Sequence, residues 1–351
     1  MFYLLIFMFF YPILKIVIIF RKKGDKTLVI QNAVIGDYAN SSIIFEKIKP
    51  FDIVLDKTNL AFANYDNRVI NKFPINDYKN KKFGKLKLAF ILFLNNYSNV
   101  YILTPNSLNL FLGKFTMAKN IVTIQPSLSK FKFLSIGTKR VNHSTNNLTT
   151  TTYLKMVNAE NEKYKKYEKC IQNPYFIPKN IKIKNDKIFK IGISLSAGNK
   201  IKTPPVQTWN KIFEILSKFN CEIYIFGIKN EDELLQQIEL KNNIVINFVN
   251  QIELRELPFY ISLLNLYISS DTGNYYIADT MKIPTICLMG PCFSSEQRGT
   301  YKSLIINSKL KPISSVFKTV RDIDAKKYFV LSQDDEKNIY DFIYSLNKNL
   351  K

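Results

Sequence analysis

The sequence has few of the residues that build covalent cross-links or metal sites. Its 351 residues include four cysteines, at positions 170, 221, 287 and 292, and a single histidine, His143. No two cysteines form a CxxC pair, so we expect inert, reduced thiols rather than a disulfide framework. A single histidine excludes a His-rich metal centre, and it stands in a polar run typical of a loop. We therefore predict no metal site and no bound cofactor.

Acidic residues are scarce relative to basic ones. Asp and Glu number 28 against 50 Lys and Arg, which gives a formal net charge of +22. Such a charge attracts anionic partners: nucleic acid, acidic lipid or a phosphorylated substrate. Lys, Asn, Ile, Phe and Tyr are abundant together, as an AT-rich genome produces, so the charge also has a compositional explanation. The 46% of hydrophobic residues excludes a disordered chain.

Residues 1–23 form a segment of their own, which we predict to be a membrane anchor helix. Residues 1–20 are apolar except for Lys15, and a basic cluster follows at 21–23. Twenty helical residues span about 30 Å, the thickness of the hydrocarbon core. Pro12 and Lys15 leave two alternatives open: the helix spans the membrane or lies in its plane. The basic cluster predicts that the body lies on the cytoplasmic side of the membrane.

Beyond residue 24 the chain alternates apolar runs with helical patterns. We expect strands at 27–30, 51–55, 100–103, 120–124, 191–195, 222–226, 266–268 and 285–288. We expect helices at 85–95, 209–219, 231–241 and 333–349. Continuous apolar strands separated by helices are typical of parallel sheets covered on both faces. The fold class is therefore α/β, with two Rossmann-like doubly wound domains at 24–170 and 188–330, a linker at 171–187 and a C-terminal helix at 331–351.

Polar residues follow several of these strands, where ligands bind in open α/β sheets. In the first half, Gly36 and Asp37 come after the first strand, and the alternative is that Asp37 simply caps a helix. In the second half, Gly198 and Asn199 precede Lys202. The three residues can bind a phosphate, and the alternative is a solvated basic loop.

Two further strand ends carry candidate residues. Glu231 opens a helix, where a carboxylate suits the helix dipole or can hydrogen-bond a ribose hydroxyl. Asp271, Thr272 and Gly273 form a turn between a strand and a helix, which suits a diphosphate. The alternative there is an ordinary capping turn.

Residues 268–279 and 283–291 resemble the DTG signature region of the ADP-heptose:lipopolysaccharide heptosyltransferases, glycosyltransferase family nine. The run 35–37 is similar to the family's N-terminal GD motif, and Lys202 and Trp209 to its K…W. The resemblance covers about residues 26–301 and implies a GT-B fold, in which two Rossmann-like domains face each other across a cleft.

The resemblance also implies a role for each candidate residue. Asp37 corresponds to the catalytic base, beside Gly36 of an acceptor-side loop, and Lys202 to the lysine that meets the donor diphosphate. The remaining donor-binding residues are Glu231 at the nucleotide ribose, Asp271, Thr272 and Gly273 of the DTG, and Gly198 and Asn199 of the phosphate loop. The chain departs from the family pattern at two positions. Tyr276 stands where the family often has a histidine, and Pro204 stands where an aromatic residue is common.

The sequence therefore predicts a membrane-anchored glycosyltransferase. It would move a sugar, heptose or a related one, from a nucleotide-diphosphate donor (ADP-heptose by resemblance) to a lipid-linked glycan such as lipopolysaccharide core. Inversion at the anomeric centre follows from the resemblance, and no metal is required. Two alternatives stay open: an inactive family member that binds donor or glycan, and a basic nucleic-acid-binding protein. Lysines scattered through both halves argue against the second, so we expect no nucleic-acid partner.

Overall fold

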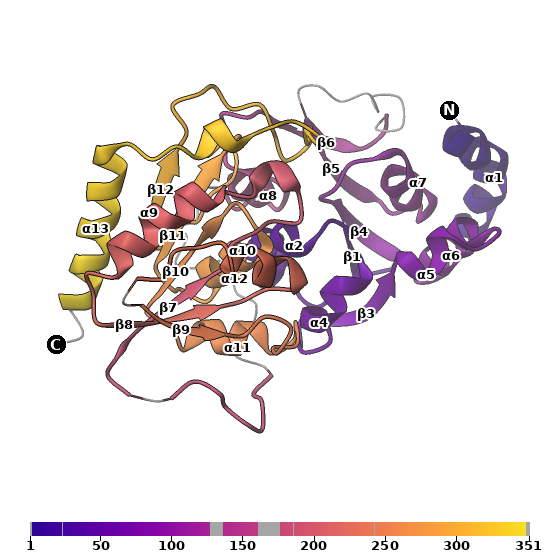
Figure 1. The fold of residues 1–351 in the computed structure, drawn as a ribbon. Coiled ribbons are helices and arrows are strands. Elements are labelled where there is room, and N and C mark those ends of the chain that lie inside the picture. The colour runs from indigo at the N-terminus through magenta and orange to yellow at the C-terminus, as the bar shows by residue number, and fades with distance from the viewer. Residues whose placement is uncertain are drawn as a thin grey trace. The chain divides into compact units, whose positions relative to one another are not determined.

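The structure is a computed structural model that describes residues 2–22, 24–126, 136–160, 176–184, 186–241 and 243–348. It divides into two compact units, Met1–Lys169 (unit 1) and Cys170–Lys351 (unit 2). Each unit contains a six-stranded parallel sheet with helices packed on it (Figure 1). The predicted α/β class with two Rossmann-like halves is confirmed. Within the predicted linker, residues 171–175 and 185 lie outside the described residues, as does Cys170.

The sheet of unit 1 has its first strand at the centre. Its order is β3 (Val69–Pro74), β2 (Phe51–Leu55), β1 (Lys26–Gln31), β4 (Tyr97–Ile102), β5 (Asn120–Pro126) and β6 (Lys139–His143). The inner strands are β-branched or aliphatic runs that are buried on both faces, such as Leu28–Ile30 of β1. The chain turns to one side of β1 with β2 and to the other with β4, so the topological switch point lies between β1 and β4.

Helices cover both faces of this sheet. They are α2 (Ile35–Ser41), α3 (Phe45–Ile48), α4 (Leu60–Ala63), α5 (Asn76–Lys79), α6 (Gly84–Leu94), α7 (Ser107–Phe115) and α8 (Thr149–Met156), with short 3₁₀ turns η1 (Ser42–Ile44) and η2 (Lys57–Asn59). The helices α6 and α7 share a core with Leu28, Ile30 and Val100 of the sheet. The predicted N-terminal helix forms as α1 (Phe2–Ile19), and it packs on α7 at the outside of this layer (Figure 1).

Unit 2 repeats this plan. Its sheet order is β12 (Ser303–Asn307), β11 (Thr285–Gly290), β10 (Leu266–Ser270), β7 (Phe189–Ile193), β8 (Cys221–Ile225) and β9 (Ile244–Asn247). The helices are α9 (Val206–Leu216), α10 (Lys229–Leu235), α11 (Leu257–Ser262), α12 (Gly273–Thr280) and α13 (Gln333–Lys348), with 3₁₀ turns η4 (Lys200–Lys202) and η5 (Lys326–Phe329). Trp209 of α9 lies fully buried in the core. The C-terminal helix α13 packs on α9, so it belongs to unit 2.

The structure differs from the sequence-based expectations at the sheet edges. Four strands that the sequence did not indicate, β3, β6, β9 and β12, are the outermost strands of the two sheets. One of them changes the interpretation of His143. It is not a loop residue but the last residue of β6, where it is buried and its Nδ1 lies 2.8 Å from Thr152 Oγ1.

Candidate functional site

The donor-side candidates of unit 2 gather at one edge of its sheet. They follow β7, β8 and β10, which are neighbours in the order β10-β7-β8. Because the strands are parallel, their carboxyl ends meet at the same edge, at the switch point between β7 and β10. Residues far apart in the sequence are thereby brought into contact.

The central contact of this edge is an ion pair between Lys202 and Asp271. Lys202 Nζ, from the loop after β7, lies 2.6 Å from Asp271 Oδ2, directly after β10. Tyr276, one turn into α12, donates its hydroxyl to Asp271 Oδ1 at 2.6 Å. Asp271 is 7% exposed and Lys202 24%. The carboxylate is therefore engaged at both oxygens and buried, whereas part of the lysine side chain faces solvent.

The ionisation of these groups follows from their surroundings. Burial favours the neutral form of Asp271, but the Lys202 charge and the hydrogen bonds from Lys202, Tyr276 and Cys292 outweigh it and lower the pKa of the carboxyl below its ordinary value. Burial, reinforced by the Asp271 charge, raises the pKa of the Tyr276 phenol. The phenol thus stays protonated and donates, while Asp271 stays charged and holds Lys202.

Glu231 lies at the same edge, at the start of α10. Its Oε2 accepts a short hydrogen bond from Ser196 Oγ, and its Oε1 accepts one from the Ser196 backbone amide at 3.2 Å. A Cβ on Gly227 would lie 2.5 Å from Glu231 Cγ, so a glycine at 227 makes room for this side chain. Burial raises the pKa of Glu231, and the hydrogen bonds from Ser196 oppose the rise.

Thr272 and Gly273 form the N-terminus of α12. Thr272 is its N-cap, and its Oγ1 accepts the Tyr275 amide at 3.5 Å, at the outer limit of a hydrogen bond. Asn274 Nδ2 donates to Ser194 Oγ at 2.9 Å, and the same hydroxyl lies 2.8 Å from Tyr267 OH. These polar contacts tie the turn after β10 to the end of β7. The first amides of α12 stand at the positive end of the helix dipole, which suits an anion.

Gly198 and Asn199 lie in the loop between β7 and η4. Asn199 Nδ2 donates to the Val320 carbonyl at 2.9 Å, whereas Gly198 is exposed and a Cβ there would meet nothing within 4 Å. The buried indole of Trp209 donates from Nε1 to the Leu195 carbonyl at 3.0 Å. This bond fixes the point where the strand ends and the loop begins.

Asp37 and Gly36 belong to unit 1. They lie in the first turn of α2, directly after the central strand β1, with Gly36 buried and Asp37 half-buried. Gln31, the last residue of β1, donates from Nε2 to the Asp37 carbonyl at 3.2 Å. Asn32 and Asn109 exchange amide hydrogen bonds of 2.7 and 2.8 Å next to this turn. Asp37 therefore stands at the carboxyl edge of its sheet, beside the switch point.

Several residues that position these groups escaped the sequence analysis. No motif marks Ser194 and Ser196, which follow β7, or Tyr267, which lies within β10. Tyr276 was visible only as a departure from a family pattern. Its role becomes clear only from its hydrogen bond to Asp271. Tyr276 lies five residues after Asp271, in the first turn of α12.

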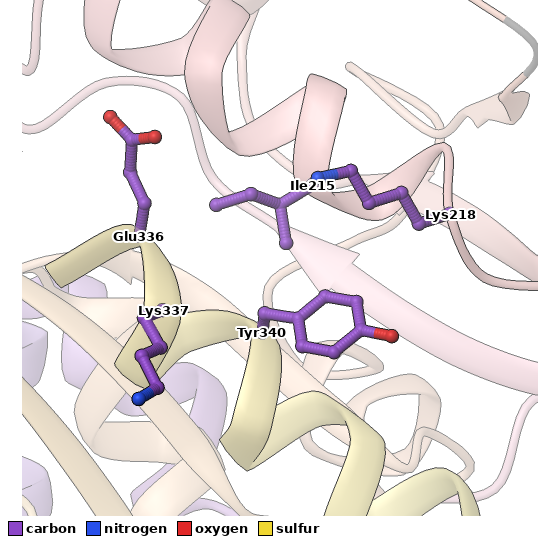
Figure 2. Close-up of a pocket in the computed structure, with 5 residues that line it drawn as sticks. All are labelled: Ile215, Lys218, Glu336, Lys337 and Tyr340. Atoms are coloured by element: carbon purple, nitrogen blue, oxygen red, sulfur yellow. The ribbon is translucent and has the colours of Figure 1, made fainter. Parts of the chain in front are cut away.

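Surface hollows occur elsewhere in unit 2. One of about 380 Å³ lies between α9 and α13, lined by Ile215, Lys218, Glu336, Lys337 and Tyr340 (Figure 2). A second of about 290 Å³ lies beside the start of α9. Neither is lined by a candidate residue, so the hollows do not mark the site. Among the described residues, no group of three or more His, Cys, Asp or Glu is placed to hold a metal ion.

The sequence of residues 149–322 matches the model of glycosyltransferase family 9 (heptosyltransferase). The chain contains a glycosyltransferase family 9 domain. The match includes the whole of the Lys202–Asp271 edge, and it confirms the predicted family. No match was found among curated proteins.

Solved structures extend the similarity of fold to both units. A family 9 glycosyltransferase from Veillonella parvula is 16% identical with a TM-score of 0.65, over 93% of this chain and 99% of that one. ADP-heptose lps heptosyltransferase II of E. coli is 14% identical with a TM-score of 0.65, over 92% and 99%. E. coli heptosyltransferase WaaC, solved with ADP-2-deoxy-2-fluoro heptose, is 13% identical with a TM-score of 0.63, over 91% and 99%. The fold is therefore GT-B-like, and family membership supports a transferase.

Proposed function

We propose that this protein transfers a sugar from a nucleotide-diphosphate donor to a lipid-linked glycan acceptor. Unit 2 holds the donor and unit 1 supplies the catalytic base. The observation that carries the proposal is the Lys202–Asp271 pair, placed at the carboxyl edge of the sheet beside the N-terminus of α12. The family match covers this edge. The solved heptosyltransferase WaaC, which shares the fold, was crystallised with ADP and with an ADP-sugar.

The donor diphosphate binds through Lys202 and the turn of α12. Asp271 accepts Lys202 on one oxygen and Tyr276 on the other, so it holds the lysine ammonium in place at the donor site. The ammonium, the Thr272 hydroxyl and the Gly273 amide stabilise the negative charge that develops on the leaving diphosphate. This stabilisation needs no metal ion. The exposed loop of Gly198 and Asn199 completes the phosphate contact.

The nucleoside binds beside Glu231. A carboxylate held by two hydrogen bonds from Ser196 keeps further lone pairs for ribose hydroxyls. Because its hydrogen bonds and its packing against Gly227 fix its position, it can select a nucleotide with both hydroxyls present. ADP-heptose is the donor that the family match favours, and a related sugar is compatible with Tyr276 in place of histidine.

Asp37 acts as the general base, beside Gly36 of the acceptor-side loop. It takes the proton of an acceptor hydroxyl, whose oxygen then bonds to the anomeric carbon as the bond to the diphosphate breaks. Attack from the face opposite to the leaving group inverts the anomeric centre. The acceptor is a lipid-linked glycan such as lipopolysaccharide core, reached at the cytoplasmic face of the inner membrane, where α1 supplies membrane association.

The test is a donor screen followed by a base substitution. The protein is incubated with a panel of nucleotide sugars and a detergent-dispersed acceptor glycan, and turnover is followed. With the active donor, Asp37→Asn keeps the shape of the side chain and removes its basicity, so turnover falls about 100- to 10,000-fold while donor affinity stays unchanged. If no donor in the panel supports turnover but one of them binds tightly, the protein is instead an inactive binder. Near-normal turnover of the variant would refute the role of Asp37.

A further inference from the structure

The helix α1 is bound to unit 1 along its length. One stripe of side chains, spaced three or four residues apart, faces the domain: Tyr3, Phe7, Phe10, Leu14 and Ile18. Phe7 and Leu14 are buried. This stripe is shared with the core of α6 and α7, and Figure 1 shows α1 lying beside α7.

Both ends of the helix contact the same domain. Near the N-terminus, the Tyr3 ring stacks on Phe111 of α7 at 5.2 Å between centroids. Just after the C-terminus, Arg21 Nη1 donates to the Phe93 carbonyl of α6 at 2.6 Å. Eighteen residues of helix separate these contacts by about 27 Å at 1.5 Å per residue. A helix that crossed a bilayer would carry its two ends to opposite sides, and one of these contacts would have to break.

The opposite stripe of α1 is apolar and open. Its exposed residues are Phe2, Leu5, Met8, Phe9, Ile13, Ile16, Val17, Ile19 and Phe20. A continuous apolar surface of this length on a folded domain marks an interaction site. The docked stripe is already covered by α6 and α7. Only the opposite side of the helix therefore requires another apolar surface to cover it.

The charged residues of α1, α6 and α7 are all basic. The first acidic residue of the chain is Asp25, and none occurs between Asp77 and Glu160, the stretch that contains α6 and α7. The same helices carry Lys85, Lys87 and Lys114, and α1 itself carries Lys15. A helix with an open apolar stripe, packed on helices that carry lysines and no acidic residue, complements the surface of an anionic bilayer.

We propose that α1 is an in-plane membrane helix. It stays docked on α7 and buries the stripe from Phe2 to Phe20 in the boundary between headgroups and acyl chains, with the lysines on anionic headgroups. It does not cross the bilayer. The occupant of the apolar stripe is thus a lipid surface, and both ends of the helix remain on the side of the catalytic body. This inference does not depend on the sugar-transfer reaction, because its readouts are binding and topology.

The first test is flotation of the full-length protein with vesicles of phosphatidylcholine, with and without phosphatidylglycerol. We expect the protein to float with both and more strongly with the anionic ones. The variant Ile13→Asp/Ile16→Asp charges two residues of the stripe, 54% and 58% exposed, and should lower vesicle affinity at least tenfold. The matched control Ile177→Asp/Ile181→Asp charges two isoleucines of unit 2, 61% and 54% exposed, and should leave affinity unchanged.

Equal binding of the two double variants would overturn the proposal. So would a full-length protein that ignores vesicles and forms a stable dimer lost on Ile13→Asp/Ile16→Asp, because a second copy would then be the occupant. Far-UV circular dichroism and thermal unfolding of the variants check that the fold is retained.

The second test separates the in-plane helix from a spanning one. An epitope tag with a protease site is placed before Met1, and the protein is added to preformed vesicles. If the helix lies in the plane of the membrane, the tag stays outside the vesicle. Protease added without detergent should then remove the tag from vesicle-bound protein as completely as from protein without vesicles. Protection of the tag until detergent is added would show a spanning helix and refute the inference. Neither readout requires turnover, so an inactive protein would leave this inference standing.

Discussion

Removing the ammonium of Lys202 tests how the donor edge of unit 2 is built. Lys202→Met keeps most of the side-chain length but leaves Asp271 charged and 7% exposed, without its cation. Breaking a buried pair on one side costs about 3–5 kcal/mol when both partners are fully buried. Lys202 is 24% exposed, so water replaces part of the lost interaction, and we expect a loss of about 2–4 kcal/mol in the free energy of unfolding.

The pH dependence of this loss gives the sharper signature. In the wild type the folded-state pKa of Asp271 is lowered, so its stabilisation is present at neutral pH and disappears as the pH falls through that value. In Lys202→Met burial dominates and raises the pKa of the same carboxyl, which then takes up a proton more readily. The difference between the two proteins should therefore be largest at neutral pH and shrink toward about pH 4.

The assay is urea unfolding followed by tryptophan fluorescence. Trp209 is the single tryptophan of the chain and is fully buried in unit 2, so its emission follows that unit. A matched control is Lys211→Met, which removes the lysine of a pair with Glu336 in the same unit, 47% and 33% exposed. An exposed pair contributes about 0–1 kcal/mol, with little change at acid pH.

The same variants separate structure from ligand binding. Adding Asp271→Asn to Lys202→Met removes the stranded charge and should restore much of the lost stability. Donor affinity should stay weak, because the ammonium that we propose to meet the diphosphate is still absent. If Lys202→Met costs no more than Lys211→Met, or costs the same at all pH values, the pair is not the buried anchor described here. Recovery of donor affinity in the double variant would refute the phosphate role of Lys202.

Three further substitutions and one control test neighbouring contacts. Tyr276→Phe removes a hydrogen bond to a buried carboxylate and should lower the unfolding free energy by about 1.5–3 kcal/mol in the same fluorescence assay. Gly227→Ala places a Cβ 2.5 Å from Glu231 Cγ and should cost about 1–3 kcal/mol and weaken donor binding in calorimetry, whereas Gly198→Ala, with nothing within 4 Å, should leave stability unchanged. Glu231→Gln should raise the free energy of unfolding at neutral pH, because burial raises the pKa of the Glu231 carboxyl and its charged form opposes folding. The gain should vanish in acid, where the wild-type carboxyl is protonated. An unchanged urea midpoint at neutral pH would contradict this.

The fold was predictable where strands are buried on both faces. Inner strands of both sheets contain buried apolar runs, such as Leu28–Ile30 of β1 and Ile286–Met289 of β11, which are typical of parallel strands covered on both faces. The four edge strands have one open side and are only partly buried. In β6 only the last residue is buried, so Lys139–His143 reads as a polar loop in the sequence. Neighbouring strands, rather than the strand's own composition, hold these edges in place.

The candidate site divides in a similar way between local and tertiary information. Thr272 as an N-cap and Glu231 at a helix start follow from short-range rules, and the structure places both as those rules require. The contact of Lys202 with Asp271 joins residues 69 positions apart and depends on β7 lying next to β10. No local pattern specifies that neighbourhood, because the sheet order is set by the packing of the whole unit.

This dependence changes what the resemblance to a family can carry over. A motif transfers the identity of a residue, but its role depends on the groups that the fold brings to it. At Asp271 these groups are a lysine and a tyrosine, one on each oxygen, so the carboxylate holds the lysine cation in place. A neutral or protonated histidine at 276 would hold the same carboxylate with a pH-dependent proton, whereas the Tyr276 phenol, with its raised pKa, keeps its proton throughout the physiological range. Tyr276 therefore holds Asp271 with a hydrogen bond that does not change over this pH range, which is a reason to place its effect on the positioning of Lys202 rather than on the chemistry of transfer.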